Sequence, residues 1–301
     1  LITLGGNITV PAGGDYDTPP INGSGHFKID GGGHTITWES TANNHHLLGN
    51  TSPDADAVYI ELTNINLDRQ DMNAAVGVYN GKITLGKDVA LSGQDGNMIL
   101  ANGEKAALEL GDGCELSYAA GSSPCCASAW FGAILVLNGG KTAAGAYIGL
   151  DCNFYPAVSY PLISVPKALT GDVHLLLKMI GTTPVAQGIG NYQLTQADCD
   201  RLKVNPESTV SLYMGQRDKY DGNFELHLDP AASFQIKLRP KNFTPPTSGN
   251  IDVTNMTDVV AQITIRAALE AGHTDLKLTG ELSKIGIGGQ WGTFANNTQI
   301  T

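Results

Sequence analysis

Short apolar segments recur at a nearly constant interval along residues 58–137. Isoleucine or leucine returns about every 25 residues, at Ile60, Leu85, Leu110 and Leu135. The same interval links a second set two positions earlier, at Val58, Ile83, Leu108 and Ala133. A unit of this size cannot bury its apolar face alone, but units stacked at a strand spacing of about 4.8 Å share one continuous core. The repeat therefore predicts a solenoid of short strands.

Two of these units superimpose as a strand, a glycine-containing corner and a second strand. Residues 83–91 align with residues 108–116, which places Val89 over Cys114 and Leu91 over Leu116. The composition agrees, because 37 glycines in 301 residues suit a chain with many tight corners. We expect an all-β fold.

The charge distribution makes nucleic acid an unexpected partner. The chain has 29 acidic and 18 basic residues and a net charge of −11, with no basic stripe that would attract a phosphate backbone. It also has no apolar run of about 18 residues, so we expect no membrane insertion. The first residues, Leu1–Leu4, already have the pattern of a strand rather than of a signal peptide, which predicts a processed chain.

A glycine-rich segment near the start carries a family resemblance. Phe27 and Ile29 alternate before a glycine corner, and Ile36 and Trp38 alternate after it. The run from Phe27 to Ile36 resembles the F-x-I-D-G-x-G-H-x-I phrase of right-handed parallel β-helix surface proteins of bacteria and of pectin-lyase-like domains. The resemblance implies that a right-handed parallel β-helix extends from the start of the chain to the region of Pro240, and it implies nothing about activity.

Later apolar segments predict further coils and then a change of structure. The expected coils are residues 173–177, 202–204, 210–213, 224–228 and 234–238, with Val210 one coil before Phe234 and Leu212 one coil before Ile236. The chain then divides into a β-helix at residues 1–240, a Pro-rich linker at 241–256 and a helix–strand segment at 257–301.

The last segment predicts a small α/β unit. Apolar residues recur at helical spacing from Thr257 or Asp258 up to Gly272, and residues 275–280 form a strand. Ile285-Gly286 and residues 294–301 resemble one unit of the BspA-like leucine-rich repeat of surface proteins, with residues 288–293 lengthening its middle. The resemblance implies the start of a leucine-rich-repeat array.

The residues that could carry metal or redox chemistry have simpler interpretations. Cys125-Cys126 could be a redox or metal pair, but buried thiols are favoured, and Cys126 lies about one coil from Cys152, close enough for a disulfide or a stack. His45-His46 lies in a polar loop and is expected to be solvated. Asp198-Cys199-Asp200 offers two carboxylates without the further oxygens of a calcium loop. We therefore predict no metal site and no cofactor.

The catalytic devices of pectin-lyase-like enzymes are not recognisable. Polygalacturonase-like enzymes use paired aspartates, and the sequence has no Asp-Asp. Arg239-Pro240 has no second arginine after it, so it does not match the lyase pattern. The cluster at residues 68–71, which contains Asp68, Arg69 and Asp71, is interpreted as a solvated corner with a local ion pair. No catalytic residue is predicted.

Aromatic side chains are the remaining candidates for a ligand surface, because sugars bind to flat rings with polar edges beside them. Trp38 continues a strand alternation and is expected to pack in the core or at the end of the solenoid, and Trp130-Phe131 could equally plug the solenoid. Tyr155 and Tyr160 lie in a Pro-rich loop and are the predicted ligand-binding residues.

These observations favour a secreted or bacterial cell-surface module. The expected role is adhesion, glycan recognition or display of neighbouring domains, with a host or dietary polysaccharide or glycoprotein as partner and the chain as a monomeric part of a larger surface protein. The alternative is a polysaccharide lyase or glycoside hydrolase of the pectin-lyase-like β-helix type, because such sites assemble from side chains on successive coils.

Overall fold

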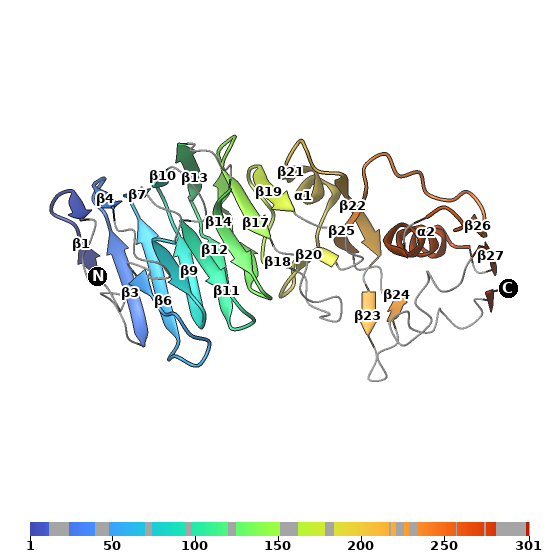
Figure 1. Cartoon of the computed structure of the whole chain (residues 1–301), viewed down its shortest axis with the longest axis horizontal. Coiled ribbons are helices and arrows are strands. Elements are labelled where there is room, and N and C mark those ends of the chain that lie inside the picture. The colour runs from blue at the N-terminus through green and yellow to red at the C-terminus, as the bar shows by residue number, and fades with distance from the viewer. Residues whose placement is uncertain are drawn as a thin grey trace.

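The fold is a parallel β-solenoid followed by a small α/β segment (Figure 1). The computed structural model describes residues 1–11, 24–39, 48–69, 74–93, 98–119, 125–150, 162–177, 184–216, 218–220, 226–228, 234–256, 258–273, 275–280 and 299–300. Parallel coils follow one another along the long axis, with the N-terminus at one end. The predicted solenoid architecture is confirmed.

Three sheets form the sides of the solenoid. The parallel part of the first sheet consists of β1 (Ile2–Thr3), β3 (Gly25–Asp30), β6 (Val58–Thr63), β9 (Gly81–Leu85), β12 (Ala106–Leu110), β15 (Ile134–Leu137), β18 (Ile163–Val165) and β20 (Pro184–Gly188). The second sheet consists of β2 (Ile8–Val10), β4 (Thr35–Trp38), β7 (Ile65–Arg69), β10 (Val89–Gly93), β13 (Glu115–Ala119) and β16 (Lys141–Thr142). The third consists of β5 (Leu48–Gly49), β8 (Val76–Val78), β11 (Ile99–Asn102), β14 (Cys125–Trp130), β17 (Tyr147–Leu150), β19 (Val173–Leu177) and β21 (Leu202–Val204).

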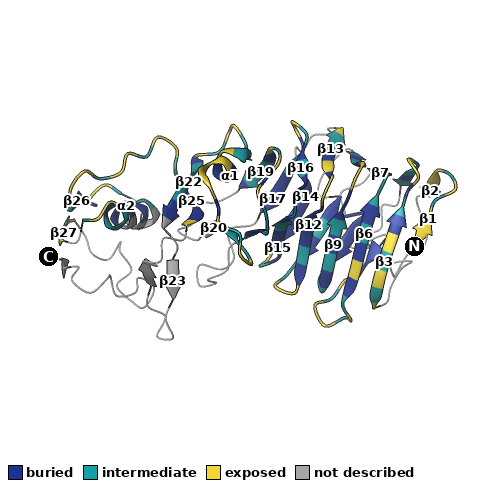
Figure 2. Ribbon diagram, turned by 180° about the vertical axis from the view of Figure 1, so that it is seen from behind, coloured by how far each residue is buried: buried dark blue, intermediate teal, exposed yellow. Residues whose placement is uncertain are grey.

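The core is built by strand alternation. Side chains at every second position point inward, so Ile60, Leu62, Ile83 and Leu85 are almost completely buried while Tyr59 beside Ile60 is exposed. Figure 2 shows the same alternation as buried and exposed bands along the strands of the first sheet. Trp38 is buried in this core, as predicted.

The coil length varies, and the predicted constant interval is wrong in detail. Ile83 and Leu85 do lie beside Leu108 and Leu110, but Ile83 pairs on its other side with Ile60 and not with Val58. Leu110 pairs with Leu137 of the following coil instead of Leu135. A shift of two positions keeps the same side chains inward, so apolar alternation alone cannot distinguish these registers.

The second sheet shows the same displacement. Leu91 pairs with Tyr118, whereas the repeat had placed it over Leu116. The aligned corners contain glycine in both units, but the strands after them start at different distances from the corner. An average repeat length therefore does not predict the length of each corner.

Glycine is required at the start of β9, where two coils meet closely. Gly81 has a φ of +124°, and a Cβ at this position would overlap the carbonyl oxygen of Val58 in the neighbouring coil. Asn64 joins β6 to β7 with a φ of 49°, which asparagine tolerates better than most residues. Asn64 is thus a corner residue, whereas Asn66 lies within β7.

The parallel stacking ends after β20 and β21. The next strand in the first sheet is β25 (Phe234–Pro240), which is antiparallel to β20, and β22 (Val210–Gln216) is antiparallel to β25. Leu212 faces Leu238 across this ribbon, so the predicted one-coil offset from Leu212 to Ile236 is wrong. The strands β23 (Asp218–Tyr220) and β24 (Leu226–Leu228) form a separate antiparallel pair.

The sequence pattern predicted parallel coils at β22 and β25 because an antiparallel pair and a pair of coils share the same apolar alternation.

A short helix, α1 (Gln196–Arg201), precedes β21. Its amino terminus has a capping box between Thr195 and Asp198.

The last described segment is the predicted α/β unit. The helix α2 (Asp258–Glu270) connects β26 (Asn250–Asp252) to β27 (Asp275–Thr279), and β28 (Gln299–Ile300) is also parallel to β27. Ile251, Val253, Ile265 and Leu276 form part of a second apolar cluster. No helix among the described residues combines the length and the apolar character needed to cross a membrane.

Candidate functional site

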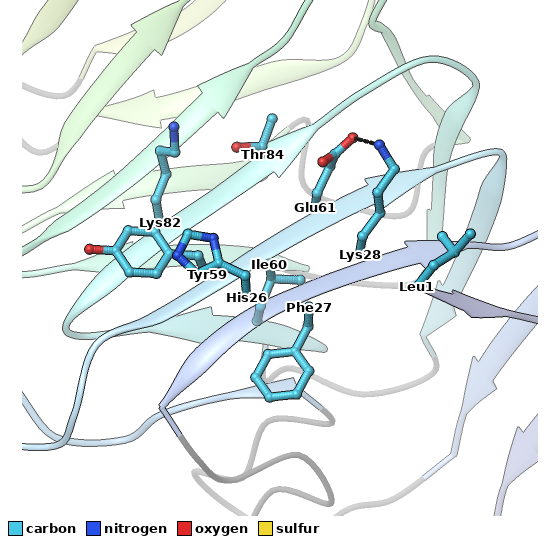
Figure 3. Close-up of a pocket in the computed structure, with 9 residues that line it drawn as sticks. All are labelled: Leu1, His26, Phe27, Lys28, Tyr59, Ile60, Glu61, Lys82 and Thr84. Carbon is cyan, nitrogen blue, oxygen red and sulfur yellow. Dashed lines mark hydrogen bonds and ion pairs between the residues drawn. The ribbon is translucent and has the colours of Figure 1, made fainter.

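The outward face of the first sheet carries a shallow depression near its N-terminal end. Alternation turns His26 and Lys28 of β3, Tyr59 and Glu61 of β6, and Lys82 and Thr84 of β9 toward the outside. These six residues, together with Leu1, Phe27 and Ile60, line a volume of about 360 Å³ (Figure 3). Three successive coils thus supply the polar lining.

A stacked pair of rings forms one part of the depression. His26 and Tyr59 are register partners on adjacent strands, and their ring centroids lie 4.5 Å apart at an interplanar angle of 11°. Tyr59 keeps 38% of its surface exposed. The stack covers one face of each ring and leaves the outer face of each, and such a flat face with a polar edge is the kind of surface to which a sugar ring binds.

An ion pair lies on the same two strands, one alternation step further along. Lys28 and Glu61 are register partners, and Lys28 Nζ donates to Glu61 Oε1 at 2.6 Å. Both side chains are substantially exposed, so the pair contributes little to stability. It does place a carboxylate and an ammonium group beside the stacked rings.

The second lysine of the depression is also neutralised. Lys82 Nζ donates to Glu109 Oε2 at 2.5 Å, and Asn138 Nδ2 donates to Glu109 Oε1 at 2.9 Å. Burial acts to raise the pKa of Glu109, but the hydrogen bonds from Lys82 and Asn138 outweigh it and hold this pKa below its usual value. Glu109 therefore stays ionised and keeps Lys82 in place.

The predicted ligand residues Tyr155 and Tyr160 lie outside the described residues, as do His45, His46 and Asp71.

Trp130 is the last residue of β14, and Phe131 follows it in a turn with a φ of 54° and with 36% of its surface exposed. Phe131 therefore does not plug the solenoid.

The interpretation of residues 68–71 as a solvated corner is wrong for the part that the structure describes. Asp68 and Arg69 belong to β7, and Arg69 is 2% exposed because alternation turns it inward. Asp68 points outward and accepts a hydrogen bond from Ser92 Oγ at 2.7 Å. The two charges therefore face opposite sides of the sheet.

The two adjacent cysteines lie at the start of a strand. Cys125 and Cys126 are both buried at the start of β14, and Cys126 carries a free thiol that donates to the Tyr147 carbonyl oxygen at 3.3 Å. Burial raises the pKa of the Cys126 thiol far above its usual value. The favoured interpretation as a buried thiol is confirmed for Cys126, while Cys152 is not among the described residues.

Asp198 serves the fold rather than a metal. Its carboxylate accepts hydrogen bonds from the Tyr192 hydroxyl at 2.6 Å, from the Leu169 amide at 2.9 Å and from Thr195 through both its amide and its hydroxyl. Within the described ranges, no group of three or more histidine, cysteine, aspartate and glutamate side chains is placed to bind a metal ion.

The depression could not be predicted from the sequence, although part of its signal is present there. The alternation that directs Phe27 and Ile29 inward also directs His26 and Lys28 outward. The register between β3 and β6 could not be predicted. The chain that connects these two strands is longer than the chain that connects any other parallel neighbours in the first sheet. Without this register, His26 and Tyr59 could not be paired.

The comparisons with known proteins give no guide to this site. No family model, curated protein or solved structure matches the chain.

Proposed function

We propose that this chain is a glycan-recognition module of an exported bacterial surface protein, and that it binds its ligand on the depression of the first sheet. The observation that carries the proposal is the stacked pair of His26 and Tyr59 beside the Lys28–Glu61 ion pair. Flat rings supply van der Waals contact to a sugar ring, while the charged groups supply hydrogen bonds to its hydroxyls. The bacterial surface location rests on the resemblance of residues 27–36 to β-helix surface proteins.

The solenoid suits this role because its coils are held together by continuous hydrogen-bonded strands. β3, β6 and β9 are paired in parallel over most of their lengths, so the side chains of the depression have fixed spacing. A rigid surface loses little conformational entropy when a ligand binds.

The lining of the depression supports recognition over hydrolysis at this place. Among the lining residues that the structure describes, Glu61 is the one carboxylate, and it is paired with Lys28. Glycoside hydrolysis generally uses two carboxylates on opposite sides of the scissile bond. The alternative function is a polysaccharide lyase or glycoside hydrolase, and the experiment must distinguish this enzyme from a binding module.

The test is a screen of the purified chain against immobilised host and plant polysaccharides, in which both retention and the release of new chain ends are followed. We expect retention without new ends, and we expect Tyr59→Ala to reduce it. Retention that survives Tyr59→Ala would instead direct attention to Tyr155 and Tyr160. New chain ends would overturn the proposal in favour of an enzyme.

A further inference from the structure

The charges around the depression define which kind of sugar it can accept. Each of its two lysines already has a carboxylate partner, Lys28 with Glu61 at 2.6 Å and Lys82 with Glu109 at 2.5 Å. An acidic sugar that approached either lysine would place its own negative charge beside the carboxylate that is already paired with that lysine, and like charges repel. It would also approach a chain with a net charge of −11.

A neutral sugar meets no such obstacle. Lys28 contacts a single oxygen of the Glu61 carboxylate, and each carboxylate oxygen can accept more than one hydrogen bond. The Lys28 ammonium has three donors, one of which is directed at Glu61. The ion pair therefore presents an acceptor and a donor side by side, which matches two adjacent hydroxyls of a sugar.

The stacked rings lie in the correct place for the same ligand. His26 and Lys28 on β3, and Tyr59 and Glu61 on β6, are successive outward positions of their strands, so the stacked rings and the ion pair form neighbouring rows (Figure 3). A sugar ring that rests against the aromatic row can direct its hydroxyls toward the charged row.

We infer that the depression selects neutral sugars with adjacent free hydroxyls, and that Glu61 and Lys28 are its specificity-determining residues. This inference rests on the proposed glycan-binding function. Glu61 accepts hydrogen bonds from the sugar hydroxyls, and Lys28 both donates to the sugar and fixes the Glu61 carboxylate.

The structure offers a matched control for this ion pair. Lys141 and Glu115 are also register partners on adjacent parallel strands, with Lys141 Nζ 3.0 Å from Glu115 Oε2, but they lie on the second sheet. Both pairs are substantially exposed, so Glu61→Gln and Glu115→Gln should perturb folding equally little. A difference between these two variants in binding then reports on the site.

The experiment measures the affinity of the wild-type chain and of both variants for neutral β-1,4-glucan and mannan oligosaccharides, and for polygalacturonate and chondroitin sulfate. We expect binding to neutral chains, a loss of about tenfold or more with Glu61→Gln, and no change with Glu115→Gln. We also expect Lys28→Met to weaken neutral binding, and acidic chains not to compete.

The outcomes separate the two proposals. If acidic chains bind in a Tyr59-dependent manner and neutral ones do not, the glycan-binding function stands and the inference is wrong. Neutral binding that is equally strong in wild type and Glu61→Gln would also overturn the inference. If none of these chains binds, the glycan-binding function fails and the inference falls with it.

Discussion

Lys237 and Glu270 join the antiparallel end of the solenoid to the helix of the α/β segment. Lys237 lies on β25 and is 1% exposed, and its Nζ is 2.8 Å from Oε1 of Glu270 at the end of α2. Gly215 on β22 provides the space, since a Cβ there would approach both the Lys237 side chain and the Glu270 carboxylate. The contact connects two parts of the chain that have separate apolar clusters.

Breaking this ion pair should cost much more than breaking an exposed one. We expect Glu270→Gln to lower the free energy of unfolding by about 3 kcal/mol, because it removes a carboxylate that is paired with a buried ammonium group. Asp88→Asn, which removes the partner of the exposed Lys87, should cost less than about 1 kcal/mol. Denaturant unfolding of both variants tests this prediction, and equal costs would contradict it.

The Asp198 network should make the protein sensitive to acid. Burial acts to raise the pKa of Asp198, but the hydrogen bonds from Tyr192, Leu169 and Thr195 outweigh it and hold this pKa below its usual value of 3.8. A lowered pKa in the folded state gives stability that is present above pH 3.8 and is lost as the pH falls through the folded-state pKa.

The test for this network is unfolding at several pH values. Asp198→Asn should lower the free energy of unfolding by about 2 kcal/mol near pH 7 and flatten its decline in acid. The control is Asp200→Asn on the exposed side of the same helix, which should leave the decline unchanged. If the free energy of unfolding of Asp198→Asn declined in acid as steeply as that of the wild type, other carboxylates would dominate the acid dependence.

Tyr192 should produce the opposite dependence at alkaline pH. Burial and the hydrogen bond to the Asp198 carboxylate raise the pKa of Tyr192 from 10 to about 12. Its contribution is therefore fully present below pH 10 and is lost as the pH rises through about 12. Absorbance titration of Tyr192→Phe against wild type should show that a late-titrating phenol has disappeared; loss of an ordinary one would refute the assignment.

Gly81 should tolerate no side chain. Gly81→Ala combines a positive φ with an overlap between its Cβ and the Val58 carbonyl, so the two coils must separate. Gly103→Ala is the matched control, because Gly103 also has a positive φ, of +97°, but its Cβ would lie 3.9 Å from the nearest atom. We expect about 1 kcal/mol of destabilisation for Gly103→Ala and several times more for Gly81→Ala, as measured by thermal unfolding.

Strand alternation was sufficient to predict the solenoid, because an inward residue at every second position is visible within each strand. It was not sufficient to align one coil with the next, as Leu110 and Leu137 show. The register depends on corner length, and corners carry no apolar signal. The candidate site could not be predicted from the sequence for the same reason, because only the strand register brings His26 and Tyr59 together.

The end of the solenoid was mispredicted for a related reason. Val210, Leu212, Phe234 and Ile236 alternate equally well in a coil and in a hairpin. Strand direction is decided by the path of the connecting chain, which leaves no trace in the alternation itself. The helix α2 was predictable because a helical period differs from a strand period.

The reversal of direction at β25 has a consequence for assembly. A stack of parallel coils has a growing edge at which another copy could dock and extend the sheet without limit. In the first sheet, β25 and β22 follow β20 at this edge; β25 runs opposite to the coils, and β22 runs in the same direction as the coils. A second copy that docked at this edge of the first sheet would therefore meet β22 of the antiparallel ribbon, and not the open edge of a parallel coil.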